Sequence, residues 1–151
     1  MAVRAIRGAI QIEANERAAV LEGTSELVTE VMDRNRLNPA DVISVVFTAT
    51  HDLNAEFPAL AARKLGFQDV PLLCATEMNV PGSMPLVVRL MMHVETERPR
   101  SAVQHVYLRG AIALRARDLE GYWTKIHQIQ FRRMVLKGVR EIDPRTGTTK
   151  H

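Results

Sequence analysis

LVVRLMMHV, residues 86–94, is the stretch that decides the fold, because it predicts a strand that is apolar on both faces. Alternate residues of a strand point to opposite sides, so one side carries Leu86, Val88, Leu90, Met92 and Val94 and the other carries Val87 and Met91. Arg89 interrupts this apolar run. The chain of 151 residues amounts to about one domain, which leaves no second domain to cover the outer side. We therefore expect a homo-oligomer, since symmetric assembly is the usual way to bury such a face.

The rest of the sequence supplies four more strands and two helices. The predicted strands cover residues 3–12, 42–50, 70–74 and 105–114, and the predicted helices cover residues 15–34 and 59–65. Asn15 and Pro58 are suited to begin the helices and Gly66 to end the second one, while Asn38-Pro39 predicts a short helical turn. This order predicts an α+β fold, a mixed five-stranded sheet with two main helices. Two helices cover only one face of such a sheet, which is a second reason to expect an oligomer.

The composition is that of a globular protein, with 46% hydrophobic and 25% charged residues. No apolar run approaches the ~20 residues that a membrane-spanning helix needs. Residues 1–7 are too short and too regularly charged for a secretory signal, so we expect a cytoplasmic protein. The lone Cys74 excludes an internal disulfide and a metal cluster held by several thiolates.

The basic charge is concentrated at the C-terminus. Residues 121–151 hold seven Lys or Arg and two acidic residues, whereas residues 1–120 hold 13 basic and 15 acidic residues. A domain with a net charge of −2 does not resemble a nucleic-acid-binding protein, although the pI of the chain is about 9.4. We divide the chain into a domain over 1–120 and a basic extension over 121–151. The extension is expected to be partly disordered, and its role stays open between a docking arm, a disordered tail and a sequence added to the natural chain.

Charged residues stand where charge is unfavourable, although the sequence has no phosphate loop, dinucleotide fingerprint, zinc motif or nucleophile elbow. Arg89 lies inside an apolar strand, Arg7 beside Gly8 in another, and Glu77 in a loop that contains prolines. A buried guanidinium needs a partner or a wet pocket. Arg89 and Glu77 therefore form either a structural ion pair or, together with Arg7, an anion pocket. Two guanidinium forks suit a small dicarboxylate.

Five blocks of the sequence resemble one family over residues 3–119. They are VRAIRGAI (3–10), FTATHDLNAEFPALAARKLG (47–66), VPLLCATEM (70–78), VVRLMMHVET (87–96) and HVYLRGAIALR (105–115). In this order and with almost no gaps, they resemble the monofunctional chorismate mutases that assemble as trimeric pseudo-α/β-barrels. The resemblance implies an isomerase of the shikimate pathway that converts chorismate to prephenate as a homotrimer, without metal or cofactor.

The resemblance also implies a role for each residue of the site. Arg7 would bind a carboxylate of the substrate's side chain, and Arg89 would reach that carboxylate and the ether oxygen. Glu77 would accept a hydrogen bond from the ring hydroxyl near Cys74, and Tyr107 would hold a carboxylate. The apolar walls would be formed by Phe57, Ala59, Leu60, Leu72, Leu73 and Leu114, and the charged mouth by Arg63 and Arg115. In the family, the portion from Phe57 to Cys74 comes from one subunit and the arginine side of the site from its neighbour.

Two departures and three rival hypotheses accompany this resemblance. Leu60 stands where some members have a lysine, and Tyr107 and Leu114 have opposite strand parity, which calls for a bulge or bend near Gly110. The rivals are a non-catalytic trimer that binds a small dicarboxylate, a trimeric imine deaminase, and a structural trimer in which Arg89 and Glu77 neutralise each other. The imine deaminase motif near the C-terminus is not found.

Overall fold

One mixed sheet carries the fold of residues 1–118, which are the residues that the computed structural model describes. Its strands are β1 (Ala2–Gln11), β2 (Val42–Ala49), β3 (Leu72–Thr76), β4 (Val87–Thr96) and β5 (Val106–Leu108), in the order β3-β2-β4-β1-β5. β4 pairs antiparallel with β1 and β2, while the outer pairs β1–β5 and β2–β3 are parallel. The predicted α+β fold with a mixed five-stranded sheet is confirmed. The central place of β4 explains why its sequence is apolar on both sides.

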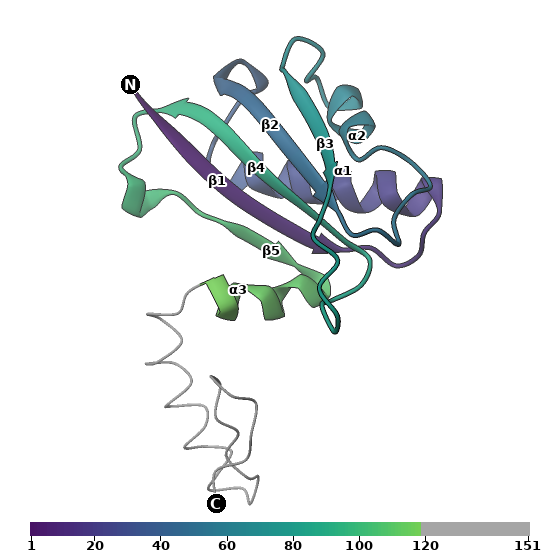
Figure 1. The fold of residues 1–151 in the computed structure, drawn as a ribbon. Coiled ribbons are helices and arrows are strands. Elements are labelled where there is room, and N and C mark those ends of the chain that lie inside the picture. The colour runs from purple at the N-terminus through teal and green to yellow at the C-terminus, as the bar shows by residue number, and fades with distance from the viewer. Residues whose placement is uncertain (119–151) are drawn as a thin grey trace, which may run out of the picture. The chain divides into compact units, whose positions relative to one another are not determined.

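Two helices lie on one face of this sheet (Figure 1). They are α1 (Arg17–Arg34) and α2 (Ala59–Lys64). Buried residues of α1, among them Val20, Leu27 and Val31, join Ile6 and Ile10 of β1 in the core. Gly8 lets the helix approach closely, because a Cβ there would lie 3.1 Å from Leu27 Cδ1.

The other face of the sheet is covered by neither α1 nor α2, and we call it the open face; it carries Arg7, Arg89 and Met91. On β4, Val88, Leu90, Met92 and Val94 lie in the core, whereas Arg89, Met91 and His93 are only half-buried. The two-sided character predicted for this strand is confirmed except at Leu86. Leu86 adopts the left-handed φ of 56°, and the strand begins after it, at Val87.

The predicted helix boundaries are mostly confirmed. Pro39 begins the short 3-10 helix η1 (Pro39–Asp41) behind the cap Asn38, and Gly66 follows α2 with a φ of 99°. The prediction for Asn15 is wrong, since Glu16 is the N-cap of α1. The Asn15 side chain instead links to the next loop: its Oδ1 accepts from the backbone N–H groups of Asn54 and Ala55.

The predicted strand over 105–114 is wrong beyond Leu108. After the 3-10 turn η2 (Arg100–Ala102), β5 ends at Leu108 and the chain turns through η3 (Arg109–Ala111) into α3 (Ile112–Asp118). Arg109 has a left-handed φ of 54°, which strand geometry does not allow. Gly110 lies against Gln11: a Cβ there would lie 1.8 Å from Gln11 Oε1, so a larger residue requires the end of this flexible side chain to move. The predicted break near Gly110 is therefore a turn into a helix and not a bulge.

The chain divides into two compact units, residues 1–112 and 113–151, and the site described below is built in the first. The predictions for the basic extension over 121–151 lie outside the described residues. Within the described part of the chain, no helix is long and apolar enough to cross a membrane.

Candidate active site

Strand register brings the predicted charged residues onto the open face. Arg89 lies opposite Thr48 of β2 on one side and opposite Ala9 of β1 on the other, and Ala9 in turn lies opposite Tyr107 of β5. Residues directly opposite each other project from the same side of a sheet. Arg7, two residues before Ala9, shares that side. The structure therefore brings Arg7, Arg89 and Tyr107 together on one surface.

Glu77 joins this surface from the end of β3. Its backbone N–H donates to the carbonyl oxygen of Ala49 at 2.9 Å, which extends the β2–β3 pairing by one residue. Glu77 Oε1 lies 2.9 Å from Arg89 Nε, and Thr48 Oγ1 donates a hydrogen bond to the same oxygen at 2.8 Å. The carboxylate side chain is only 15% exposed. The ion pair that the sequence left open is thus present.

The Arg89–Glu77 pair occupies one edge of the guanidinium. The Nε–H does not point along the line to Oε1, so this buried nitrogen is ion-paired without an aligned hydrogen bond among the described residues. Nη1 and Nη2 donate no hydrogen bond to a residue of the described part, and the Arg89 side chain is 35% exposed. The terminal nitrogens, which form the fork that matches a carboxylate, therefore remain on the accessible side of the open face.

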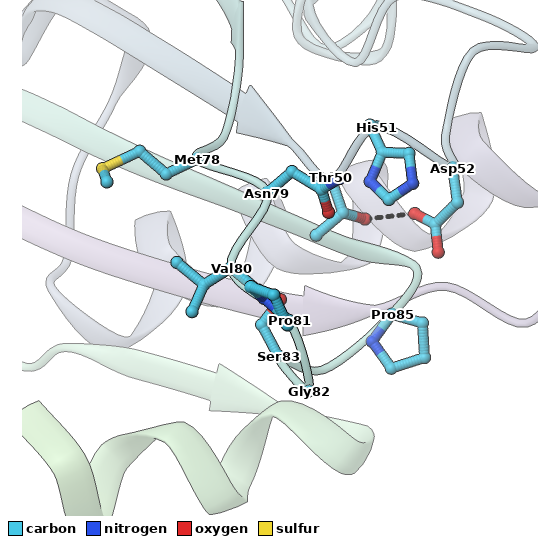
Figure 2. Close-up of a pocket in the computed structure, with 10 residues that line it drawn as sticks. All are labelled: Thr50, His51, Asp52, Met78, Asn79, Val80, Pro81, Gly82, Ser83 and Pro85. Carbon is cyan, nitrogen blue, oxygen red and sulfur yellow. Dashed lines mark hydrogen bonds between the residues drawn. The ribbon is translucent and has the colours of Figure 1, made fainter.

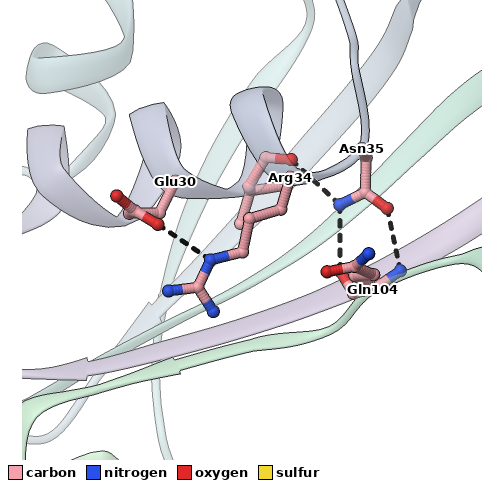
Figure 3. A network of polar contacts seen from close by, with 5 residues as sticks. Glu30, Arg34, Asn35 and Gln104 are labelled. Atoms are coloured by element: carbon pink, nitrogen blue, oxygen red, sulfur yellow. Dashed lines mark hydrogen bonds and ion pairs between the residues drawn. The ribbon is translucent and has the colours of Figure 1, made fainter.

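The β5 edge of this surface is held by hydrogen bonds to two side chains, His105 and Asn35. The Arg7 backbone N–H donates to His105 Nδ1 at 3.0 Å. Asn35, which is 3% exposed, donates from Nδ2 to the carbonyl oxygens of Val31 and Gln104 and accepts the Gln104 N–H at Oδ1 (Figure 3). The bonds of Asn35 are buried or partly buried, and they fix the segment that leads into Tyr107.

The predicted wall residues from Phe57 to Cys74 lie away from the arginines of the same chain. β3 is the opposite edge strand from β5, and its Leu72 and Cys74 face the core beside the start of α2. Leu73 projects from the open face and is 61% exposed, and Phe57 is 70% exposed. Burial raises the pKa of the Cys74 thiol, and a contact with the Ala59 backbone only partly opposes this, so the thiol is neutral near pH 7. Within one chain, these residues do not complete a pocket with Arg7 and Arg89.

The remaining predicted residues are placed as follows. Ala59, Leu60 and Arg63 lie on α2, and Arg63 Nη1 donates to the carbonyl oxygens of Phe67, Gln68 and Val70 at 2.7 to 3.1 Å. One nitrogen of Arg63 therefore holds the α2–β3 connection. Leu114 and Arg115 lie on α3, in the second unit.

A hollow of about 190 Å³ lies beside the end of β2 (Figure 2). It is lined by Thr50, His51, Asp52, Met78, Asn79, Val80, Pro81, Gly82, Ser83 and Pro85. None of these was predicted as a site residue. Asp52 accepts hydrogen bonds from Thr50 Oγ1 and from the Leu86 N–H, so its role visible here is to hold the left-handed residue before β4.

Three residues of this surface were not predicted from the sequence: Thr48, Asn35 and His105. A threonine in a strand is ordinary, and only the register that sets Thr48 opposite Arg89 distinguishes it. Among residues 1–118, no group of three or more His, Cys, Asp or Glu side chains is arranged to hold a metal ion.

Comparison with known proteins gives one consistent result. The model of the family described as chorismate mutase type I matches residues 3–119. The chain is 44% identical over 119 residues to chorismate mutase AroH of Thermus thermophilus, covering 78% of this chain and 97% of that protein. It is 40% identical over 116 residues to chorismate mutase AroH of Bacillus subtilis (strain 168), covering 76% and 91%. The solved chorismate mutase from Clostridium thermocellum superposes with a TM-score of 0.72 at 42% identity, covering 73% of this chain and 98% of that one.

Proposed function

The chain belongs to the chorismate mutase type I family, and from this premise we propose how its residues convert chorismate to prephenate. The activity is that of an isomerase in phenylalanine and tyrosine biosynthesis. The reaction is an intramolecular Claisen rearrangement, in which a C–O bond breaks and a C–C bond forms within one molecule. Because no proton moves, neither a general base nor a nucleophile is required. The protein can act by holding the flexible side chain over the ring and by stabilising charge at the ether oxygen.

Arg89 stabilises that charge in our proposal. The observation that carries the assignment is that its 2.9 Å ion-pair contact with Glu77 is made by Nε, while the terminal nitrogens donate no hydrogen bond to a described residue. Arg89 also sits on the central strand, hydrogen-bonded on both sides, so the cation is held in place before substrate arrives. One fork nitrogen would donate to the ether oxygen and the other to a carboxylate. Lysine is a poor replacement because a point charge lacks this planar fork.

Arg7, Glu77 and Tyr107 complete this side of the site in our proposal. Arg7 would bind the carboxylate of the enolpyruvyl side chain, and Tyr107 would help to hold a carboxylate. The second oxygen of Glu77, Oε2, accepts no hydrogen bond from a described residue, and it would accept one from the ring hydroxyl. This set explains how a single acceptor and several donors recognise a dicarboxylate that carries one hydroxyl.

The site is shared between subunits of a trimer in this proposal. Two observations support it: the open face is half-buried and apolar beside its charges, and the wall residues lie at the opposite edge of the sheet. Phe57, Leu73 and Cys74 of one subunit would then close the pocket over Arg7 and Arg89 of the next. Closed threefold symmetry gives three such sites. Cytoplasmic location stays a prediction.

Mixing two inactive variants tests the sharing. One variant is Arg89→Ala and the other Phe57→Asp, each refolded or co-expressed in equal amounts. Random mixing in a closed trimer assembles one intact site in every mixed trimer, which restores about a quarter of wild-type activity. Activity equal to the sum of the two separate variants would show that each subunit builds its own site.

The activity itself is tested by following the ultraviolet absorbance of chorismate with purified protein, with and without a chelator. We expect absorbance loss with prephenate as the product, at the same rate in both samples. Loss no faster than the spontaneous reaction would favour the alternative, a non-catalytic dicarboxylate-binding trimer. The family membership does not favour that alternative.

A further inference from the structure

We propose that Thr48 is a positioning residue that acts on the reaction through Glu77, an inference that rests on the proposed function of the site. Thr48 lies on β2 directly opposite Arg89 of β4, and both project from the open face. Its hydroxyl donates to Glu77 Oε1 at 2.8 Å. We assign Thr48 no direct contact with the substrate. It is therefore a positioning residue and not a catalytic residue.

The geometry explains why Glu77 needs such a partner. Glu77 follows the last residue of β3 and is fixed to the sheet by its backbone bond to Ala49. Its side chain lies beside the loop over 78–85, and among the described residues this loop donates no hydrogen bond to the carboxylate; Met78 in that loop is 85% exposed. Arg89 attracts Oε1 from one side, but its Nε–H is not aligned with that oxygen. The aligned hydrogen bond comes from Thr48 alone among the described residues.

Fixing Oε1 also fixes Oε2. A carboxylate is planar, so holding one oxygen between Thr48 and Arg89 sets the direction in which the other projects. Without the Thr48 hydroxyl, the carboxylate can rotate towards the Arg89 terminal nitrogens and engage the fork that we assign to the substrate. Thr48 thereby keeps the acceptor and the cation apart, each available for its own part of the ligand.

The experiment is a double-mutant cycle between Thr48 and Glu77. Thr48→Val removes the hydroxyl while keeping the β-branched shape, Thr48→Ser keeps the hydroxyl, and both are measured in wild-type and Glu77→Ala backgrounds, since alanine removes the acceptor oxygen that glutamine would keep. We expect Thr48→Val to lower kcat/KM about 5- to 10-fold, which is less than the loss of a direct hydrogen bond to a charged group, because Thr48 acts only through Glu77. Thr48→Ser should restore activity to within about 2-fold, and Thr48→Val should have no further effect beside Glu77→Ala.

Controls separate positioning from general damage. Thr76→Val removes an equivalent hydroxyl from β3, where the side chain is exposed, and is expected to leave kcat/KM unchanged. Thermal unfolding of every variant accompanies the kinetics, and Thr48→Ala enters the same cycle if Thr48→Val does not fold.

The outcomes are distinct. An equal loss from Thr48→Val in both backgrounds, or no loss at all in an active enzyme, overturns the inference about Thr48 and leaves the proposed function intact. A wild-type protein without activity on chorismate overturns the proposed function instead.

Discussion

Two arginine–glutamate ion pairs with nearly equal N–O distances have different roles in this molecule. Arg34 Nε and Glu30 Oε2 lie 2.8 Å apart on α1, with side chains 42% and 39% exposed. Arg89 Nε and Glu77 Oε1 lie 2.9 Å apart on the open face, where Glu77 is 15% exposed and Thr48 binds the same oxygen. The first pair is a solvated contact between successive helical turns. The second pair joins Arg89 of β4 to Glu77, which follows the last residue of β3. It holds the Arg89 guanidinium on the open face from a rigid strand. Distance alone does not distinguish them; burial and the supporting strands do.

Removing the cation of the open-face pair is expected to have the largest effect. Arg89→Ala should lower kcat at least about 100-fold, by analogy with the loss of one donor to a developing oxyanion. Steady-state kinetics on chorismate, with circular dichroism to establish that the variant is folded, measure this. Activity within a few-fold of wild type would remove Arg89 from the centre of the mechanism.

Removing the negative charge of Glu77, the partner of Arg89, should lower turnover less than removing the arginine. Glu77→Gln keeps the shape and one acceptor oxygen, so we expect kcat/KM to fall about 10- to 100-fold, as for a lost hydrogen bond to a charged group. Part of this loss reflects Arg89 without its counter-charge. The measurement is again chorismate turnover, and a variant as active as wild type would show that Glu77 has a structural role only.

The helix pair provides the matched control for both variants. Arg34→Ala should change the free energy of unfolding by no more than about 0.5 kcal/mol, the usual value for an exposed i,i+4 pair, and should leave turnover unchanged. Denaturant titration and the chorismate assay test this together. A large loss of activity here would mean that arginine removal acts through the fold.

Removing a third ion pair, between Arg17 and Glu56, is expected to have the smallest effect. This effect on stability should depend on pH. The pKa of Glu56 is lowered, first by its hydrogen bond from the Phe57 N–H and then by Arg17. A depressed carboxyl pKa stabilises the folded state above the unfolded pKa and loses this contribution as pH falls through the folded one. The stability difference between wild type and Glu56→Gln should therefore be full at neutral pH and shrink below about pH 4. A difference that is constant from pH 7 to pH 3 would contradict the assignment.

Most strands could be predicted because β-branched and apolar residues alternate in short runs, and the core residues Val88, Leu90 and Met92 follow directly from that alternation. The end of β5 could not. Ala111 to Leu114 is a short apolar stretch that fits a strand or a helix, and the left-handed Arg109 that selects the helix has no sequence signal. Asn15 suits a cap by type, but its side chain binds the loop at Asn54 instead.

The candidate site also contains residues that could be predicted from the sequence and residues that could not. Arg89 could be selected from the sequence because a charge in an apolar strand requires an explanation. Thr48 could not, since only strand register reveals that it faces Arg89. The roles of Phe57, Leu73 and the other wall residues came from family resemblance, because no periodicity relates them to Arg7. Their separation from the arginines within one chain is a structural result, and the sharing of the site between subunits is our proposal to account for it.

The most direct test of the central claim is the separation of kcat from KM in Arg89→Lys. If Arg89 stabilises the transition state through its planar fork, lysine keeps the charge and loses the geometry. We then expect a large fall in kcat with a smaller change in KM. A raised KM with kcat unchanged would mean that Arg89 binds substrate and transition state equally, and the assignment of charge stabilisation to this residue would be wrong.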